Sequence, residues 1–131
     1  MAQEEIPANV RAFLNDHVES VVQVEVLLLL YADPGRTFAT SDVVSALRIE
    51  PAWAEAQLSN LVARGMLAEA AAAGSYRWAP RTAEIEAAVA GLARAYADRR
   101  VTVIGLIYAK PADPLRSFAD AFRIRRDKDH G

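Results

Sequence analysis

Apolar residues recur at helical spacing along the first third of the chain and predict two helices. The first follows Pro7, a residue favoured at the start of a helix, and is expected to end near His17. The second is expected to begin at Ser20, which stands three residues before Gln23 in the pattern of a capping box. The Asp-Pro-Gly sequence at 33–35 would end it. Its predicted core-facing stripe comprises Val22, Val26, Leu29 and Leu30.

Shorter elements follow in the middle of the chain. Residues 36–39 alternate polar and apolar side chains and predict a small strand, after which Thr40 or Ser41 would cap a helix. Pro51 is placed to begin a further helix, and Gly65 to end it, because glycine tolerates the left-handed backbone that often follows a helix. The expected inward faces of these two helices are Val43, Val44 and Leu47, and Ala54, Leu58, Leu61 and Val62.

Residues 66–70 and 75–79 are expected to pair as a β-hairpin across the small residues 72–74. Successive side chains of a strand point to opposite faces, so Tyr76 and Trp78 would share one face and Arg77 would lie on the other. The predicted order is therefore helix, short strand, helix, helix and hairpin.

This order, and the residues that carry it, resemble a known class of regulators. The stretch from Ser20 to Pro80, including LLLLYADPGRTFATSDVVSALRIEPAWAEAQLSNLVARGML and the closing YRW, resembles the winged helix-turn-helix of bacterial MarR-class (multiple-antibiotic-resistance) transcription regulators. The resemblance covers about half of the chain and implies a mainly α fold with a small β-wing. The sequence LIYAKPADPLRSFADAFRIRRDKD is similar to the tail of small uncharacterised bacterial proteins that carry this module. The end of the helix expected after Pro51 has the pattern L-x-x-L-x-x-x-G-[ML], a moderately specific sign of the winged-helix fold but not of any one function; its residues are Leu58, Leu61, Gly65, Met66 and Leu67.

The C-terminal part is expected to form a helical arm. Thr82 is suited to cap one long helix over 82–110, whose apolar residues alternate between spacings of four and three, with Arg99 in the single interrupting slot. Residues 101–108 are rich in β-branched side chains and by propensity alone also fit a strand, but we favour a helix. Asp113 and Pro114 would begin a last helix.

Composition excludes several classes of protein. The chain has 131 residues, of which 53% are hydrophobic and 24% charged, as expected for one globular domain with an appendage. Its longest strongly apolar run, residues 26–32, is far shorter than the roughly 20 residues of a membrane-spanning helix. Because the first residues also lack a secretory signal, we expect a cytoplasmic protein without a membrane partner. The lack of Cys excludes disulfides and thiol chemistry.

Enzymatic chemistry is not expected. The glycines are scattered singly, so no phosphate-binding loop is present, and the only histidines are His17 and His130. We interpret His17 and Asp16 as a surface pair rather than a catalytic one. The sequence therefore predicts no catalytic residue, no metal site and no cofactor.

Charge is distributed unevenly along the chain. Residues 1–35 carry one basic and six acidic side chains, residues 36–81 five and four, and residues 82–131 nine and seven. Since the acidic N-terminal third cannot bind phosphates, contact with nucleic acid would have to come from the rest of the chain. The bases of the tail would either clamp a phosphate backbone or only keep the tail hydrated; they are Arg116, Arg123, Arg125, Arg126 and Lys128.

A winged helix usually reads duplex DNA with its third helix in the major groove and its hairpin on the backbone or in the minor groove. By this resemblance we predict a DNA-binding transcriptional regulator, although Glu50 and Glu55 and the lack of any Lys before residue 110 weaken the prediction. The alternative is a module that docks a protein partner. Trp53 is expected in the core, and an exposed Trp53 would favour such a partner. The predicted DNA-binding residues are Gln57, Asn60, Arg64, Arg77, Arg81 and Arg36.

The chain thus divides into an N-terminal helix over 1–19, a winged helix-turn-helix over 20–80 and a helical arm over 81–131. The apolar seam of the arm must be covered, either by the last helix folding back or by a second copy of the chain, and we expect a homodimer. The residues predicted to pack there are Ile85, Val89, Leu92, Tyr96, Val103, Ile107, Leu115, Phe118 and Phe122.

Overall fold

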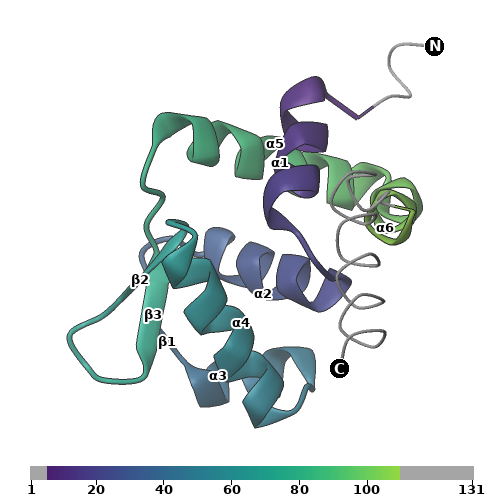
Figure 1. Cartoon of the computed structure of the whole chain (residues 1–131). Coiled ribbons are helices and arrows are strands. Elements are labelled where there is room, and N and C mark those ends of the chain that lie inside the picture. Colours follow the sequence, from purple (N-terminus) through teal and green to yellow (C-terminus); the bar gives the residue numbers. More distant parts are fainter. Residues whose placement is uncertain (1–5, 110–131) are drawn as a thin grey trace, which may run out of the picture.

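The computed structural model describes residues 6–109, which form a mainly helical unit with one small sheet (Figure 1). The predicted fold class is confirmed. The predicted last helix, with Leu115, Phe118 and Phe122, lies outside the described residues. In chain order the elements are α1 (Ala8–His17), α2 (Val21–Tyr31), β1 (Phe38–Ala39), α3 (Thr40–Leu47), α4 (Pro51–Ala63), β2 (Leu67–Glu69), β3 (Ser75–Trp78), α5 (Ala83–Asp98) and α6 (Arg100–Tyr108).

The predicted capping box joins α1 to α2. The Ser20 hydroxyl accepts a hydrogen bond from the Gln23 backbone N–H at 3.1 Å, which satisfies one of the free donors of the first helical turn. In a capping box the side chain of Gln23 would accept a hydrogen bond from the backbone N–H of Ser20. Here Gln23 Oε1 instead accepts from the backbone N–H of the preceding residue, Glu19, at 2.5 Å. The connection between the two helices is therefore fixed from both sides.

Helix α2 is the centre of the fold and contacts α3, α4, α5 and β3 (Figure 1). A helix surrounded in this way buries most of its circumference, so the predicted single stripe on α2 is only partly right. Val22 and Leu29 are half-buried, whereas three residues outside the predicted stripe, one of them polar, are fully buried. The buried apolar residues of α2 are Val24, Val26, Leu27 and Leu30.

The three short strands form an antiparallel sheet in the order β1-β3-β2. In β2 and β3, Leu67 pairs with Trp78 and Glu69 with Tyr76, so the hairpin has the predicted register. Tyr76 and Trp78 are buried on one face, as predicted, and Arg77 is exposed on the other. The Trp78 ring packs edge-on against Tyr31 of α2, with ring centroids 5.1 Å apart. The sheet is thus fastened to the central helix.

The residues predicted to begin and end α3 and α4 do so, except for the N-cap of α3. Helix α3 begins one residue earlier than predicted, with Ala39 rather than Thr40 or Ser41 as its N-cap. The Asp42 carboxylate accepts a hydrogen bond from the Ala39 N–H at 2.8 Å, which is the bond from N3 back to the N-cap in a capping box, whereas the Ala39 side chain has no acceptor to cap the helix. Helix α4 begins at Pro51 and is followed by Gly65, whose φ of 86° is the left-handed conformation predicted for it.

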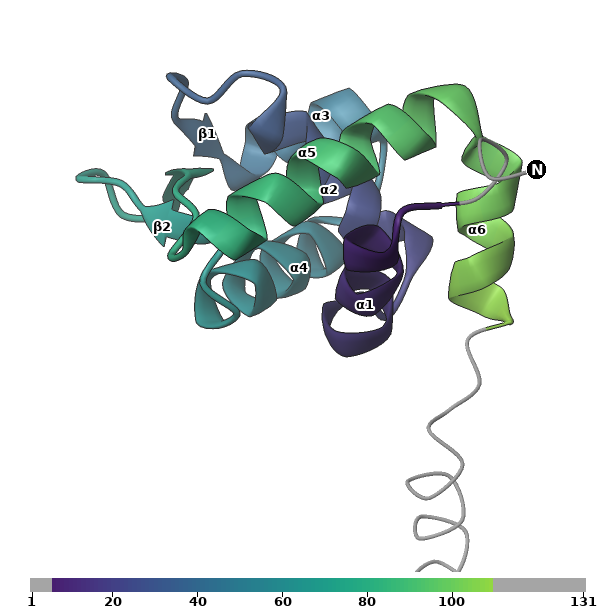
Figure 2. The same cartoon turned by 90° about the horizontal axis from the view of Figure 1, so that it is seen from above.

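The prediction of one long helix over 82–110 is wrong, because the helix breaks at Arg99. Its backbone, at φ −138° and ψ 54°, is not helical, and α6 turns away from the line of α5 at this point (Figure 2). The break lets Val103 and Ile107 pack inward, where both are buried and α6 contacts α1. Residues 101–108 are helical despite their β-branched composition, because this packing outweighs local propensity.

The buried side chains of all these elements form one continuous cluster. Val89, Leu92, Val103 and Ile107 belong to it, and Ile85 and Tyr96 pack against it, so these predicted arm residues lie in the protomer's own core. Helices α1 and α5 approach closely at Gly91, where an added Cβ would lie 2.7 Å from Val10 Cγ2. Within residues 6–109 no helix is both long and apolar enough to span a membrane.

Candidate nucleic-acid interface

Helix α4 packs against the protein along one face and is exposed to solvent on the other. Ala54, Leu58 and Leu61 follow helical spacing and are buried against α2 and α3. Pro51 supplies the first turn without an unsatisfied backbone donor, so the helix starts cleanly at the surface. The outward side chains are Ala52, Trp53, Glu55, Ala56, Ser59 and Ala63, with Gln57 half-buried beside them.

Trp53 is exposed, and its prediction as a core residue is wrong. Its side chain is 58% exposed, the largest apolar surface on α4. The inward position of this turn is taken by Ala54, which is fully buried, and Trp53 precedes it by one residue, about 100° around the helix. A large ring therefore projects from the first turn of α4, and this is the exposure that the sequence analysis associated with a protein partner rather than with DNA.

The last turn of α4 is held by polar contacts. Asn60 Oδ1 accepts hydrogen bonds from Gln23 Nε2 and from Arg64 Nε, each at 2.9 Å. Arg64 also donates to the Glu19 carboxylate at 2.8 Å and to the Asp16 carbonyl at 3.3 Å. Because a carbonyl oxygen has two lone pairs, Asn60 Oδ1 is fully used. In this arrangement Asn60 cannot make the bidentate contact with adenine for which it was predicted, and Arg64 is neutralised by an acid.

Gln23 is a residue of this region that the sequence analysis treated only as part of a capping box. It is 1% exposed and is the one buried polar or charged side chain among the described residues. Besides Asn60 it reaches the His17 carbonyl, to which its Nε2 donates at 3.0 Å, and it accepts from the Glu19 N–H. Its isolated amide within the apolar run VVQVEVLLLL was the available signal. We call Gln23, Asn60, Arg64 and Glu19 the anchor network, since they join α4 to the junction of α1 and α2.

The other predicted DNA-binding residues lie at separate places. Arg36 stacks over the Phe38 ring, 4.3 Å from its centroid, and is 3.9 Å from the Asp42 carboxylate. Arg77 is exposed on the outer face of the hairpin. Arg81 is exposed behind the C-terminal end of α4, where its N–H donates to the Gly65 carbonyl at 2.7 Å. The structure therefore does not gather these arginines into one cluster.

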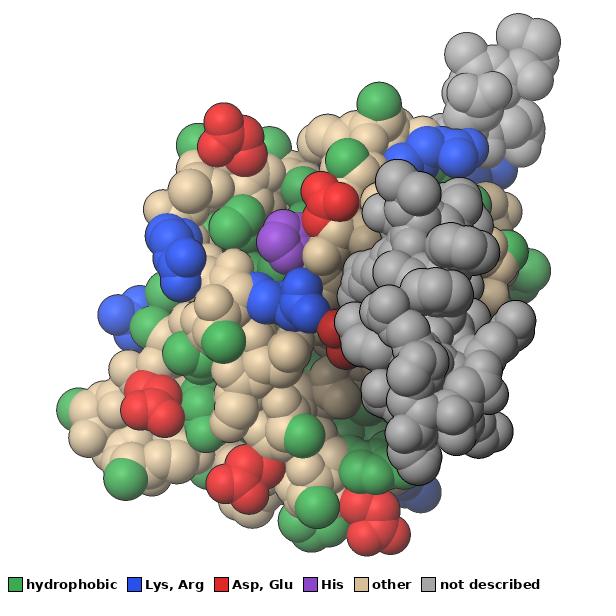
Figure 3. All heavy atoms as spheres, in the orientation of Figure 1, with side chains coloured by type: hydrophobic (Ala, Val, Ile, Leu, Met, Phe, Trp, Pro, Cys, Tyr) green, Lys and Arg blue, Asp and Glu red, His purple; other side chains and the backbone are tan. Residues whose placement is uncertain are grey.

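Charges around α4 are mixed. Its outward side carries Glu55, and Glu50 precedes its first turn, whereas its one arginine, Arg64, has only 23% of its side chain exposed. On the face seen in Figure 3, basic and acidic side chains are interspersed and no continuous basic patch covers α4. Attraction for a phosphate backbone thus depends on a few separate arginines.

A comparison with solved structures identifies the fold. The chain superimposes on the crystal structure of a MarR family transcriptional regulator from Streptomyces coelicolor with a TM-score of 0.54 and 19% sequence identity, over 98% of this chain and 88% of that one. The chain has the winged-helix fold of that regulator. No protein-family model matches the sequence, and neither does any curated protein.

In winged-helix terms, α3 and α4 form the helix-turn-helix, and β2 and β3 form the wing. The turn between α3 and α4 contains Arg48, whose φ of 57° is left-handed. The tip of the wing, residues 70–74, consists of four alanines and Gly74, so the basic residue of the wing is Arg77 on its strand. Helix α4 thus has the position in the fold of the helix that enters the major groove in DNA-binding winged helices.

A second polar cluster ties the arm to the winged helix. The Tyr96 hydroxyl of α5 donates to Glu25 of α2 at 3.0 Å, and Arg100 of α6 pairs with the same carboxylate at 3.1 Å. Burial raises the pKa of the Tyr96 hydroxyl, and the hydrogen bond to Glu25 raises it further. The cluster fixes the start of α6 against α2.

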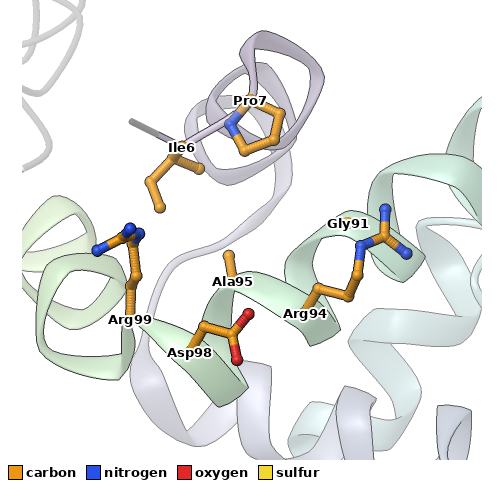
Figure 4. A pocket seen from close by; sticks show the side chains of 7 residues that line it. All are labelled: Ile6, Pro7, Gly91, Arg94, Ala95, Asp98 and Arg99. Atoms are coloured by element: carbon orange, nitrogen blue, oxygen red, sulfur yellow. The ribbon is translucent and has the colours of Figure 1, made fainter. Parts of the chain in front are cut away.

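A small open cavity of about 170 Å³ lies between the start of α1 and α5 (Figure 4). No residue of α4 lines it; it is formed by Ile6, Pro7, Gly91, Arg94, Ala95, Asp98 and Arg99. Among residues 6–109 no group of three or more His, Asp or Glu side chains could hold a metal ion. This cavity is thus separate from the exposed side of α4.

Proposed function

We propose that this chain is a DNA-binding transcriptional regulator that acts as a dimer. The observation that carries the proposal is the winged-helix fold in which α4 turns a complete side outward. A solved protein with this fold is a transcriptional regulator. A helix so mounted fits the major groove of duplex DNA.

The contacts follow from the position of each side chain. Gln57 on α4 faces the base edges, and its amide can donate to and accept from adenine. In this proposal Arg36, which lies just before β1, and Arg77 on the wing bind phosphates, and Arg81 does so beyond the C-terminal end of α4. Asn60 and Arg64 act through the anchor network, by holding α4 in place.

The dimer is proposed to form through the arm. Val101 and Tyr108 on α6 are 84% and 76% exposed, which is unusual for large apolar side chains on an ordered helix. A second copy of the chain covers them in this proposal, and two-fold symmetry then presents both copies of α4 to successive major grooves about 34 Å apart.

Selection of duplexes from a random library at low salt tests the proposal, with the mass of the complex measured by light scattering. We expect enriched sequences with two related half-sites and two protein chains per duplex. Gln57→Ala should weaken binding about tenfold for a lost bidentate contact, and Arg77→Glu should weaken it on every sequence alike. A dimer that retains no duplex would overturn DNA binding and favour the docking of a protein partner instead.

A further inference from the structure

We propose that α4 reads A·T base pairs through the C5-methyl groups of thymine, with Trp53 and Ala56 as the methyl contacts and Gln57 as the adenine contact. This inference rests on the proposed function, since it names the class of DNA sequence that α4 recognises.

Guanine recognition is what α4 lacks. The commonest contact to guanine is a bidentate one from Arg or Lys. The single basic side chain of α4 is Arg64, in the residue that caps its last turn, and its guanidinium is committed to Glu19 and Asn60. Releasing it would break the anchor network and leave Glu19 unpaired. The outward side of α4 therefore has no Arg or Lys side chain available for the bidentate contact to guanine.

Apolar contact is what α4 offers. In the major groove only thymine carries a methyl group, and small or aromatic apolar side chains recognise it. Trp53 projects its ring from the first turn, and Ala56 presents a methyl group nearly one turn later. Trp53 and Gln57 are four residues apart, about 6 Å along the helix axis.

Glu55 limits what can lie beside these A·T pairs. Its exposed carboxylate accepts hydrogen bonds only, and in the major groove the amino groups of cytosine and adenine are the donors. Glu50, just before the helix, and Glu55 also repel phosphates near the first turn. The recognised half-site is thus rich in A·T pairs, with a G·C pair admitted where its cytosine faces Glu55.

Replacing thymidine by deoxyuridine in the selected operator isolates the methyl group, because it leaves every Watson–Crick hydrogen bond in place. The affinity of the unmodified protein should fall about fourfold for each contacted methyl group removed, and on the order of tenfold or more for a symmetric pair of half-sites. Binding is measured by fluorescence anisotropy at fixed salt, because affinity depends on ionic strength.

Two variants of α4 distinguish the methyl contact of Trp53 from the adenine contact of Gln57. Trp53→Ala should bind the thymidine operator more weakly and lose most of its preference over the deoxyuridine operator. Gln57→Ala should weaken both operators equally and keep the preference. Trp53 is exposed and Gln57 is half-buried at the edge of the packed face, and neither is among the buried residues of α4, so circular dichroism should show unchanged helix content.

The outcomes distinguish this inference from the proposed function. If no duplex is retained, both fail. If an operator is selected but its deoxyuridine form binds the unmodified protein equally well, or if the selected half-sites are guanine-rich over α4, regulation of DNA stands and the methyl contact is wrong.

Discussion

At the scale of single residues, Gln23 shows how one amide organises a surface helix. Its three hydrogen bonds reach α1, the α1–α2 junction and α4, although these partners are up to 37 residues away in sequence. A buried amide is tolerated only if its donors and acceptors are satisfied, and in the described residues no buried side-chain polar atom lacks a partner. The position of α4 therefore depends on a residue outside it.

Gln23→Leu should destabilise the fold by about 2 kcal/mol, because it removes the part-buried hydrogen bonds that the Gln23 amide makes to the Glu19 N–H, the His17 carbonyl and Asn60. The measurement is urea denaturation followed by circular dichroism. Gln57→Leu makes the same chemical change on the outward side of α4 and should cost about 0.5 kcal/mol or less. Equal midpoints for the two variants would contradict a structural role of the anchor network.

Tyr96 makes stability depend on pH in the alkaline range. Its pKa is raised in the folded state, so above about pH 10 the hydroxyl of the unfolded chain loses its proton before that of the folded chain. This deprotonation stabilises the unfolded state relative to the folded state and lowers the free energy of unfolding. The contribution of Tyr96 is therefore complete below pH 10 and is lost as the pH rises through the folded pKa.

Comparison of urea midpoints between pH 8 and 11 checks this sign. Tyr96→Phe should show a smaller alkaline fall than the unmodified protein. Glu25→Gln should show an intermediate fall, because burial of the hydroxyl is the larger cause of the raised pKa and persists in that variant. Parallel curves for the unmodified protein and Tyr96→Phe would exclude the effect.

At the scale of elements, local signals predicted where most helices begin and end. Pro51, Gly65 and Thr82 act where their chemistry predicts, and alternation along residues 75–78 predicted which side chains of the hairpin are buried. The break at Arg99 could not be predicted, because spacing alone does not distinguish a polar residue tolerated in a helix from one that interrupts it. The turn is decided by the burial of Val103 and Ile107 against the rest of the protein.

The candidate site was less predictable than the fold. The sequence places Gln57, Asn60 and Arg64 on one side of α4, but only the tertiary structure reveals that Gln23 and Glu19 occupy two of them. Trp53 was misplaced for a similar reason, since hydrophobicity indicates burial only where a neighbouring element is available to cover the side chain. Local patterns therefore predict elements better than contacts.

Where α1 crosses α5, the effect of one substitution on stability should change sign with the size of its neighbour. Gly91→Ala should destabilise the fold by about 1 kcal/mol, because the clash with buried Val10 exceeds the gain in helix propensity. In a Val10→Ala background the same substitution should become stabilising.

Gly105→Ala is the matched control, since an added Cβ there meets no atom within 4 Å, and it should stabilise α6 by about 0.5–1 kcal/mol. Thermal and urea unfolding measure all four variants. A stabilising Gly91→Ala in the unmodified background would show that the two helices separate easily.

At the scale of the whole molecule, the exposed apolar side chains mark two different surfaces. Trp53 lies on α4, and Val101 and Tyr108 lie on α6. The first is assigned here to DNA and the second to a copy of the same chain. The two assignments are independent, so each can be tested while the other is kept.

Val101→Glu combined with Tyr108→Glu should convert the proposed dimer to a monomer, because two acids per chain would be buried without partners in the interface. Light scattering after gel filtration measures the mass. Trp53→Glu places an acid on the other exposed apolar surface and should leave the mass unchanged. A double variant that remains dimeric would place the interface elsewhere.

The anchor network divides α4 into a fixed end and a free end. Asn60 and Arg64 hold the last turn, while the outward positions of residues 52–59 are unconstrained by the rest of the fold. A chimera could therefore carry the side chains of another protein at those outward positions and keep Asn60 and Arg64. Helix α4 would then keep its position in the fold while its preference for DNA sequence changed. Recoding the protein for another sequence would then require exchanging a few side chains rather than transplanting a helix.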